Sequence, residues 1–310
     1  MAIGMKRSSS GRNSTSHNRA ARAGVLLRAL ALVTLLASVA RPQYLEATIK
    51  LPDTLGWLDW PLSLVHNPQG NKIYVGCGDG VLVIDGATDQ RLARIRMTGG
   101  RVHSLCYNPK ENKVYAADLA RGYVFVIAGA TDSVIASIGV VSYAFCYNSA
   151  NNKVYCVTPD ENRVTVIDGA TNSVVAIIDV GYWPHGLCYN SLNNKVYCAN
   201  SVSGDVTVLD GVTDSVISTV PAEGDAWYLY YCSGNNKVYC ANGPTSNSVT
   251  VIEGASDSVL ATIPVGTNPR ALCYNQQDNR IYCANFSSGT VTVLDGAGDS
   301  IIATVGVQTG

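Results

Sequence analysis

The stretch Asn194-Lys-Val-Tyr-Cys-Ala-Asn200 decides the fold of this 310-residue chain, because close copies of it return at a regular interval. Its basic residue recurs at Lys72, Lys113, Lys153, Lys195, Lys237 and Arg280. The successive intervals are 41, 40, 42, 42 and 43 residues. A period of about 42 residues is typical of β-propellers, WD-like arrays and helical HEAT-type repeats.

The fourth repeat indicates strands rather than helices. Its four short β-rich runs are Gly186–Asn190, Lys195–Ala199, Val206–Asp210 and Ser215–Val220. Clusters of Asn, Gly, Ser and Asp separate them and favour turns. No window carries an apolar stripe at helical spacing over the length of a helix. The repeat therefore predicts an all-β propeller of four-stranded antiparallel blades, apolar on both faces.

The number of blades stays open between six and seven. The chain has six sets of the first three strands but seven copies of the fourth, the extra copy being Leu45–Leu51. We expect six blades, because an unclosed ring would leave exposed edges that are prone to association.

The N-terminal region resembles an export signal. Residues 1–22 are basic and Ser-rich, an apolar run follows from Ala23 to Leu36, and Ala37 and Ala40 fit the small-residue rule for cleavage. We expect a signal peptide over residues 1–40 and a propeller over 41–310, exported to the periplasm, the cell surface or the medium. An uncleaved anchor is the alternative, although Arg28 interrupts the apolar run.

The charge balance argues against nucleic acid as a partner. Six basic and no acidic residues precede position 41, which leaves 16 basic and 23 acidic residues for the rest of the chain. A net charge near −7 does not suit a surface that binds phosphates. No later apolar run reaches 18 residues, so we expect no membrane span after signal removal.

Tyrosine and cysteine recur in the first hairpin of each repeat. A hairpin centred on Asn193 predicts that Tyr189 faces Tyr197 and that Cys188 faces Cys198. His66 replaces the first of these tyrosines in the first repeat, so we expect it to be a packing residue opposite Tyr74.

These hairpins leave two interpretations for the ten cysteines. In an exported protein, facing pairs could form disulfides. The candidate bridges are Cys146–Cys156, Cys188–Cys198 and Cys273–Cys283. The alternative is that these thiols are small buried hydrophobic residues, because Cys106 and Cys240 have no facing cysteine. We expect no metal site, since no second pair of ligands lies at the required spacing.

The Lys-Val-Tyr-Cys-Ala-Asn strings resemble the YVTN β-propeller repeat of secreted and surface-layer proteins. The match is closest in the last three repeats, where Val-Thr-Val and Ala-Thr-Ile/Val segments follow, and Cys stands where the family has Val. The resemblance implies a propeller over almost all of residues 41–310. It implies little about function, because propellers host many chemistries.

A ring of chemically diverse residues is the candidate site. Ten positions before each repeat's basic residue lie Leu62, His103, Tyr143, His185, Trp227 and Arg270. By analogy with other propellers, the start of the innermost strand lines the axial channel, where ligands bind. Their neighbours in the sequence include Trp60, Trp183, Glu223 and Asp225.

Two functions compete for this ring. In the first, Tyr143 and Trp227 stack on a glycan, peptide or protein ligand, and Arg270, His103 and His185 anchor its polar groups. In the second, the ring is the active site of a lactonase- or lyase-like enzyme, with His103 or His185 as general base and Arg270 stabilising an oxyanion. We favour a non-enzymatic binding scaffold without a cofactor, because no catalytic triad or carboxylate pair recurs at a telling spacing.

The Asp-Gly-Ala-Thr-Asp segments are the last motif, and they could suggest calcium. They hold too few acidic oxygens for such a site. Turn chemistry explains them instead, with Asp bonding its own backbone and Gly adopting a positive φ. Asn152, Asn194 and Asn236 are likewise expected to be turn residues.

Overall fold

Residues 61–97 and 100–307 are the part of the chain that the computed structural model describes, and all of them belong to the unit Ile49–Gly310. The expected signal peptide over residues 1–40, the strand Leu45–Leu51 and Trp60 lie outside the described residues. They remain predictions.

The described residues form six four-stranded sheets, each with four consecutive strands in sequence order. The first sheet holds β1 (Ser63–Asn67), β2 (Lys72–Cys77), β3 (Gly80–Asp85) and β4 (Arg91–Arg96). The second holds β5 (Val102–Asn108), β6 (Lys113–Asp118), β7 (Tyr123–Ala128) and β8 (Ser133–Ile138). The third holds β9 (Phe145–Asn148), β10 (Lys153–Thr158), β11 (Arg163–Asp168) and β12 (Val174–Asp179). The fourth holds β13 (Pro184–Asn190), β14 (Lys195–Asn200), β15 (Asp205–Asp210) and β16 (Val216–Pro221). The fifth holds β17 (Ala226–Cys232), β18 (Lys237–Asn242), β19 (Ser248–Glu253) and β20 (Val259–Pro264). The sixth holds β21 (Pro269–Asn275), β22 (Arg280–Asn285), β23 (Thr290–Asp295) and β24 (Ser300–Gly306).

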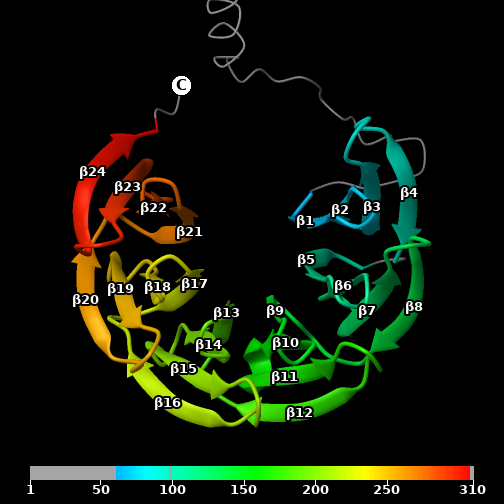
Figure 1. The fold of residues 1–310 in the computed structure, drawn as a ribbon, viewed down its shortest axis with the longest axis horizontal. Coiled ribbons are helices and arrows are strands. Elements are labelled where there is room, and N and C mark those ends of the chain that lie inside the picture. The colour runs from blue at the N-terminus through cyan, green and yellow to red at the C-terminus, as the bar shows by residue number, and fades with distance from the viewer. Residues whose placement is uncertain (1–60, 98–99, 308–310) are drawn as a thin grey trace, which may run out of the picture. The chain divides into compact units, whose positions relative to one another are not determined.

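The sheets are the blades of a β-propeller, as the repeat predicts. All pairings are antiparallel between neighbouring strands. Within the unit that holds them, the sheets follow one another around a common centre, with the first strand of each sheet innermost and the fourth outermost (Figure 1). The short 3-10 helix η2 (Pro159–Glu161) is the one helical element in the described residues, and none of their helices could cross a membrane.

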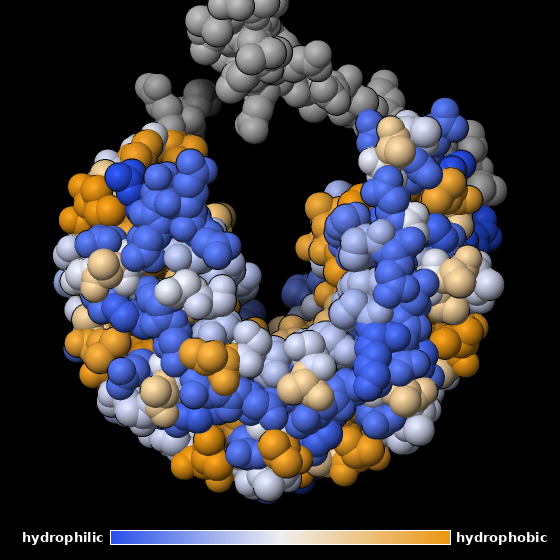
Figure 2. Space-filling model, viewed as in Figure 1, coloured by the Kyte–Doolittle hydropathy of each residue, from blue (hydrophilic) through white to orange (hydrophobic). Residues whose placement is uncertain are grey.

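The outermost strands expose aliphatic side chains. Pairs such as Val216–Ile217 and Val259–Leu260 are exposed on β16 and β20. Figure 2 shows hydrophobic groups at intervals along the outer rim. Each of these strands is the outer edge of its sheet, so it has a neighbouring strand on one side only. Its apolar residues are therefore mostly exposed or half-buried.

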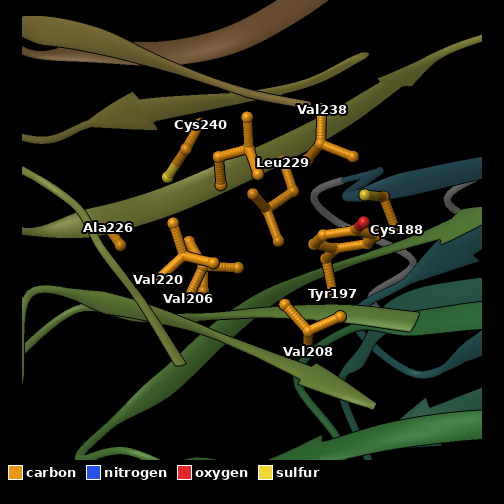
Figure 3. Close-up of a cluster of buried hydrophobic side chains, with 11 residues drawn as sticks. Cys188, Tyr197, Val206, Val208, Val220, Ala226, Leu229, Val238 and Cys240 are labelled. Atoms are coloured by element: carbon orange, nitrogen blue, oxygen red, sulfur yellow. The ribbon is translucent and has the colours of Figure 1, made fainter. Parts of the chain in front are cut away.

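The hydrophobic core lies between neighbouring sheets, because successive side chains of a strand point to opposite faces. Between the fourth and fifth sheets, Tyr197 and Val208 pack against Leu229, Val238 and Cys240 (Figure 3). Four further clusters repeat this arrangement at the other boundaries. The four middle sheets therefore pack against two neighbours each, and the first and sixth against one each among the described residues, as in other repeat architectures.

A polar clasp joins each pair of neighbouring sheets. At the third boundary, Lys153 Nζ lies 2.6 Å from Asp214 Oδ2 and the Tyr155 hydroxyl donates to Asp214 Oδ1 at 2.6 Å. The equivalent Lys–Tyr pairs meet Asp132, Asn172, Asp257 and Asp299 at the other boundaries. Burial, followed by the bond to Asp214, raises the pKa of Tyr155. The recurring Lys-Val-Tyr motif is thus the donor half of an inter-sheet contact.

The first hairpin of each sheet turns at an asparagine in the left-handed conformation. This residue is Asn71, Asn112, Asn152, Asn194, Asn236 or Asn279, with φ between 46° and 56°. The turn assignment of Asn152, Asn194 and Asn236 is confirmed. Some of these side chains also accept a hydrogen bond from the preceding sheet, as from Asn148 Nδ2 to Asn194 Oδ1 at 2.9 Å.

The predicted register of this hairpin is wrong by one residue. Asn190 pairs with Lys195, so Cys188 lies opposite Tyr197, and Tyr189 lies opposite Val196. The loop has one residue fewer than a hairpin centred on Asn193 would need. A shift of one position moves every side chain to a different partner.

The three candidate disulfides do not fit this register. Cys188 points into the core shared with the fifth sheet, whereas Cys198 points into the core shared with the third. Cys146 and Cys156 are divided in the same way. The last proposed pair was Cys273–Cys283, but Cys273 lies opposite Tyr282, and only Cys283 is buried. All ten cysteines are free, and burial raises the pKa of most of the buried thiols.

His66 is not the packing residue that the repeat predicts. It lies opposite Ile73 rather than Tyr74, and its side chain is exposed. The equivalent tyrosine of the second sheet, Tyr107, packs against the sheet before it. The difference arises because His66 lies in the first sheet, which has no preceding sheet among the described residues to pack against.

The Asp-Gly turns are confirmed in one respect and corrected in another. Asp210 Oδ1 accepts bonds from the backbone N–H groups of Val212 and Thr213, both at 2.8 Å. The positive φ belongs to Asp214, at 57°, and not to the glycine. Gly211 is required by proximity instead, because a Cβ there would lie 2.5 Å from Asn194 Oδ1 and 2.6 Å from the Asn194 carbonyl oxygen.

Candidate functional site

A β-bulge presents each residue of the predicted ring at the start of an innermost strand. In β13, Pro184 pairs with Asn200 and Gly186 pairs with Ala199, so His185 is the extra residue. The same register shift places one unpaired residue in β5, β17 and β21; these residues are His103, Trp227 and Arg270. A bulge removes a residue from the ladder and redirects its side chain, which is common beside binding sites.

Tyr143 and Leu62 occupy comparable backbone positions just before their strands. The Tyr143 N–H donates to the Val157 carbonyl, and the Val157 N–H donates to the Ala144 carbonyl, both at 3.1 Å. Tyr143 and Ala144 thus both lie opposite Val157, just as two residues lie opposite one in the other bulges. The Leu62 N–H donates to the Gly76 carbonyl at 2.9 Å, although Gly76 already pairs with Ser63. The six positions are therefore structurally equivalent.

The ring residues form two stacked groups. His103 and Tyr143 lie with their ring centroids 5.9 Å apart. In the other group, the centroids of His185 and Trp227 are 4.0 Å apart, and the Arg270 guanidinium carbon lies 5.7 Å from the Trp227 ring. Five of the six ring positions thus contact a neighbouring ring residue. Leu62 is exposed and has no aromatic partner among the described residues.

Phe286 is a member of this site that the sequence analysis missed. The Arg270 guanidinium carbon lies 4.8 Å from its ring centroid, so the cation is held between two aromatic rings. The Phe286 N–H donates to the Asn268 carbonyl at 2.9 Å, which fixes the loop after β22 beside the start of β21. Its exposure, 70%, is high for a phenylalanine. Phe286 directly follows the repeat motif, at a position where the other repeats have a smaller residue. This difference was the signal available in the sequence.

Burial governs the charge of His185. Desolvation, followed by the charges of His103 and Arg270, lowers the pKa of His185 to about 4. Its imidazole is therefore neutral near pH 7 and can stack on Trp227 and accept or donate a single hydrogen bond. His103 contributes an unused polar atom, since its buried Nδ1 has no hydrogen-bond partner in the described residues.

Arg270 is the cationic group of the site. Its Nε donates to Asn268 Oδ1 at 3.3 Å, and no salt bridge to it is formed within the described part of the chain. A guanidinium on aromatic faces gains cation–π energy of about 0.5–2 kcal/mol and keeps its remaining donors free. Those donors suit carboxylate or hydroxyl oxygens.

Trp183 lies beside the ring with a strained backbone. Its φ is 58°, a value that bulky residues rarely adopt. Three hydrogen bonds hold it there. Its N–H donates to Asn162 Oδ1 at 2.9 Å, and its carbonyl accepts from the Ser201 N–H at 3.0 Å and from the Ser201 hydroxyl at 3.1 Å. Trp183 and Tyr182 are exposed, and they add aromatic surface next to His185. Such strain is concentrated at binding sites in many proteins.

The acidic neighbours do not complete a metal site. Glu223 is exposed and Asp225 is half-buried before β17. In residues 61–97 and 100–307, no group of three His, Cys, Asp or Glu side chains comes close enough to hold a metal ion. Neither ring histidine is hydrogen-bonded to a carboxylate in this part of the chain.

Comparisons with known proteins support the fold. No family model matches the chain, and no curated protein matches its sequence. Its structure is similar to hydrazine synthase from Kuenenia stuttgartiensis, with a TM-score of 0.67 and 16% identity over 86% of this chain and 91% of that chain. It is also similar to the computationally designed Ika8 protein, with a TM-score of 0.66 and 17% identity over 79% of this chain and 73% of that chain. At these identities the likeness shows the fold alone: the described residues form a β-propeller with six four-stranded blades.

Proposed function

We propose that this protein is an exported, non-enzymatic binding propeller of the YVTN repeat type, which recognises a glycan or peptide at its inner ring. The observation that carries the proposal is the stack of His185, Trp227 and Arg270, continued by Phe286. Flat aromatic faces beside an unpaired cation match a sugar ring or an aromatic peptide side chain that bears an acidic group.

The bulges support binding rather than packing as the role of these residues. A side chain in the regular ladder would point into a core between two sheets. His185 and Trp227 are instead extra residues of their strands and touch each other across the boundary between sheets. Their contacts create a continuous surface from separate strands.

The alternative of a lactonase- or lyase-like enzyme has weaker support. A general base works best with a pKa near the working pH, whereas the pKa of His185 is lowered to about 4. No carboxylate among the described residues orients either ring histidine. Neutral His185 is therefore better suited to stacking and hydrogen bonding.

A thermal-shift screen tests the proposal. The purified protein is heated with neutral oligosaccharides, uronic-acid oligosaccharides, acidic peptides and lactones. A ligand that binds the ring stabilises the wild type by about 2.7 kcal/mol at one hundred times its Kd. Trp227→Ala and His185→Ala should lose that shift. Leu62→Ala, at the equivalent bulge without an aromatic partner, is the matched control and should keep it.

Two results would contradict the proposal. One is a stabilising ligand whose effect survives Trp227→Ala. The other is lactone hydrolysis that His185→Ala or Arg270→Ala abolishes, because this result would favour the enzyme. Export is tested separately by N-terminal sequencing of the secreted protein, for which we expect a new terminus at Arg41.

A further inference from the structure

Basic and aromatic side chains alternate around the inner ring. His103, His185 and Arg270 lie near the starts of β5, β13 and β21, which are the innermost strands of alternate sheets (Figure 1). Tyr143 and Trp227 occupy the ring positions between them. Tyr143 lies 5.9 Å from His103, and Trp227 lies 4.0 Å from His185, measured between ring centroids. The ring therefore gathers three basic groups, and none of its six positions is acidic.

Two of the three basic groups have hydrogen-bonding capacity that the described residues do not use. The Arg270 side chain is exposed, and its Nε alone is hydrogen-bonded in residues 61–97 and 100–307, to Asn268 Oδ1. A guanidinium has five N–H donors, so four remain for a ligand. His103 adds its buried Nδ1, which has no partner in the same residues. Unused donors beside aromatic faces indicate a ligand that supplies acceptor oxygens.

The charges that act on His185 are both cationic. After burial, the charges of His103 and Arg270 are the next causes that lower the pKa of His185 to about 4, and the Trp227 backbone opposes them. The imidazole stays neutral because a further positive charge beside Arg270 has nothing to offset it. A ligand carboxylate in the ring would provide that offset, since a nearby negative charge favours the protonated imidazole.

The other titratable groups around His185 do not provide this negative charge. β13 packs against β9, β10, β14 and β17. Towards the start of β13 these elements and the segments before them bring phenols, thiols and two acids: Tyr143, Cys146, Cys198, Tyr228, Glu223 and Asp225. Phenols and thiols are uncharged between pH 4 and pH 7. The acids are not among the causes that shift His185. The lysines of β10 and β14 lie at the opposite strand ends, in the clasps.

We propose that the inner ring binds the carboxylate of its ligand between Arg270 and the two histidines, and that His185 takes up one proton as the ligand binds. The inference rests on the binding function proposed above and adds to it the charge of the ligand and a dependence on pH. Arg270 and His103 donate hydrogen bonds to the carboxylate oxygens. The proton on His185 comes from the solvent, and no covalent bond of the ligand changes.

Three probes test the inference by isothermal titration calorimetry of the purified protein at pH 7 and pH 5. Trigalacturonate carries its carboxylates on sugars, and its fully methyl-esterified form is the neutral match. The peptide Glu-Tyr-Glu carries carboxylates on a peptide, so the acid that binds identifies the source. Both acids remain mainly ionised at pH 5. Titrations in two buffers of different ionisation enthalpy give the number of protons taken up.

The acid that binds should have a Kd about tenfold lower, or better, at pH 5 than at pH 7. The reason is linkage: a carboxylate that returns the pKa of His185 from about 4 towards 6.5 makes the complex bind about one more proton near pH 5. The methyl ester should change its Kd less than about threefold, because it offers no negative charge. Arg270→Gln should weaken the acid at both pH values.

Two further variants assign the proton. In His185→Gln, the Kd of the acid should change less than about threefold between pH 7 and pH 5, because the titrating group is gone. Glu223→Gln combined with Asp225→Asn is the control for nearby carboxylates and should keep the tenfold change. Carbon-13 NMR of labelled histidines reads His185 directly in the wild type, where the acid should raise its pKa and the ester should not. This measurement does not depend on the folding of a variant.

The remaining outcomes overturn the inference, and they separate it from the binding function. An ester that binds as tightly as the acid, at both pH values, would mean that the aromatic faces bind without a carboxylate. A pH dependence that survives in His185→Gln would place the proton on another group. If neither acid binds at millimolar concentration at pH 5, the ring is not a carboxylate site. A neutral oligosaccharide whose stabilising effect Trp227→Ala removes would still support the binding function in each of these cases.

Discussion

Tyr155 and Asp214 are 59 positions apart in the sequence, and the Tyr155 hydroxyl donates a 2.6 Å hydrogen bond to Asp214 Oδ1 across the boundary between two blades. Lys153 binds the other carboxylate oxygen at 2.6 Å. One acid thus satisfies two donors of the preceding blade. Because the contact returns at every described boundary, it sets how each blade is placed on the next.

Removing this acid should destabilise the fold. Asp214→Ala leaves the Tyr155 hydroxyl and the Lys153 ammonium without their acceptor, at a cost of about 2–3 kcal/mol in the free energy of unfolding. Denaturant unfolding followed by circular dichroism measures the change. Asp89→Ala is the matched control, because Asp89 occupies the same turn position, at φ 57°, with no clasp from a preceding blade. Equal losses in both variants would show that the clasp contributes nothing beyond the turn.

His185 should make stability depend on pH. Its pKa is 6.5 when unperturbed and about 4 in the folded protein, so the unfolded chain binds more protons between these values. The stability associated with neutral His185 is complete above pH 6.5 and is lost as the pH falls towards 4, by roughly 2 kcal/mol after solvent screening. Comparing His185→Gln with the wild type from pH 7.5 to 4.5 isolates this contribution from the carboxylates. Parallel curves for the two proteins would contradict the assignment.

A methyl group at the Asp-Gly turn should not be tolerated. In Gly211→Ala, the new Cβ would lie 2.6 Å from the Asn194 carbonyl oxygen, so the turn must shift, at about 1–3 kcal/mol. Thermal unfolding should show a lower Tm. Gly139→Ala has 3.9 Å of clearance to Tyr123 and should leave the Tm unchanged or slightly raised. If Gly211→Ala has the same Tm as the wild type, the close approach of Asn194 is not the reason for a glycine at this position.

The thiols should titrate as one exposed group and nine buried groups. In the native protein, about one equivalent of a chromogenic disulfide reagent should react rapidly, because Cys273 alone is exposed. In denaturant without reductant, all ten should react. A denatured count of four would restore the three bridges Cys146–Cys156, Cys188–Cys198 and Cys273–Cys283.

The repeat predicted the blades because its strands are short, its turns are marked by Asn and Asp-Gly, and its period is long enough for four strands. It did not predict the register, since a four-residue loop that pairs Asn190 with Lys195 and a five-residue loop that pairs Asn190 with Val196 fit the same sequence equally well. That single residue decides whether Cys188 faces Cys198 or Tyr197, and with it the disulfide hypothesis.

The predicted ring positions coincide with bulges, a feature that the sequence did not reveal. Diversity at His185, Trp227 and Arg270 indicated a position outside the core, but only the pairing shows the bulge that causes it. Phe286 could not be placed beside Arg270 from spacing, because Arg270 lies on β21 and Phe286 in the loop after β22. The acceptor role of Asp214 was hidden likewise, since turn chemistry alone already explained an acid in that segment.

The bulges also have an evolutionary consequence. A residue that is excluded from the ladder can be exchanged without breaking the strand pairing that builds its blade. Under the binding role that we propose, several such positions on one scaffold would let recognition diversify by single substitutions, while the sequences that build the blades remain nearly constant.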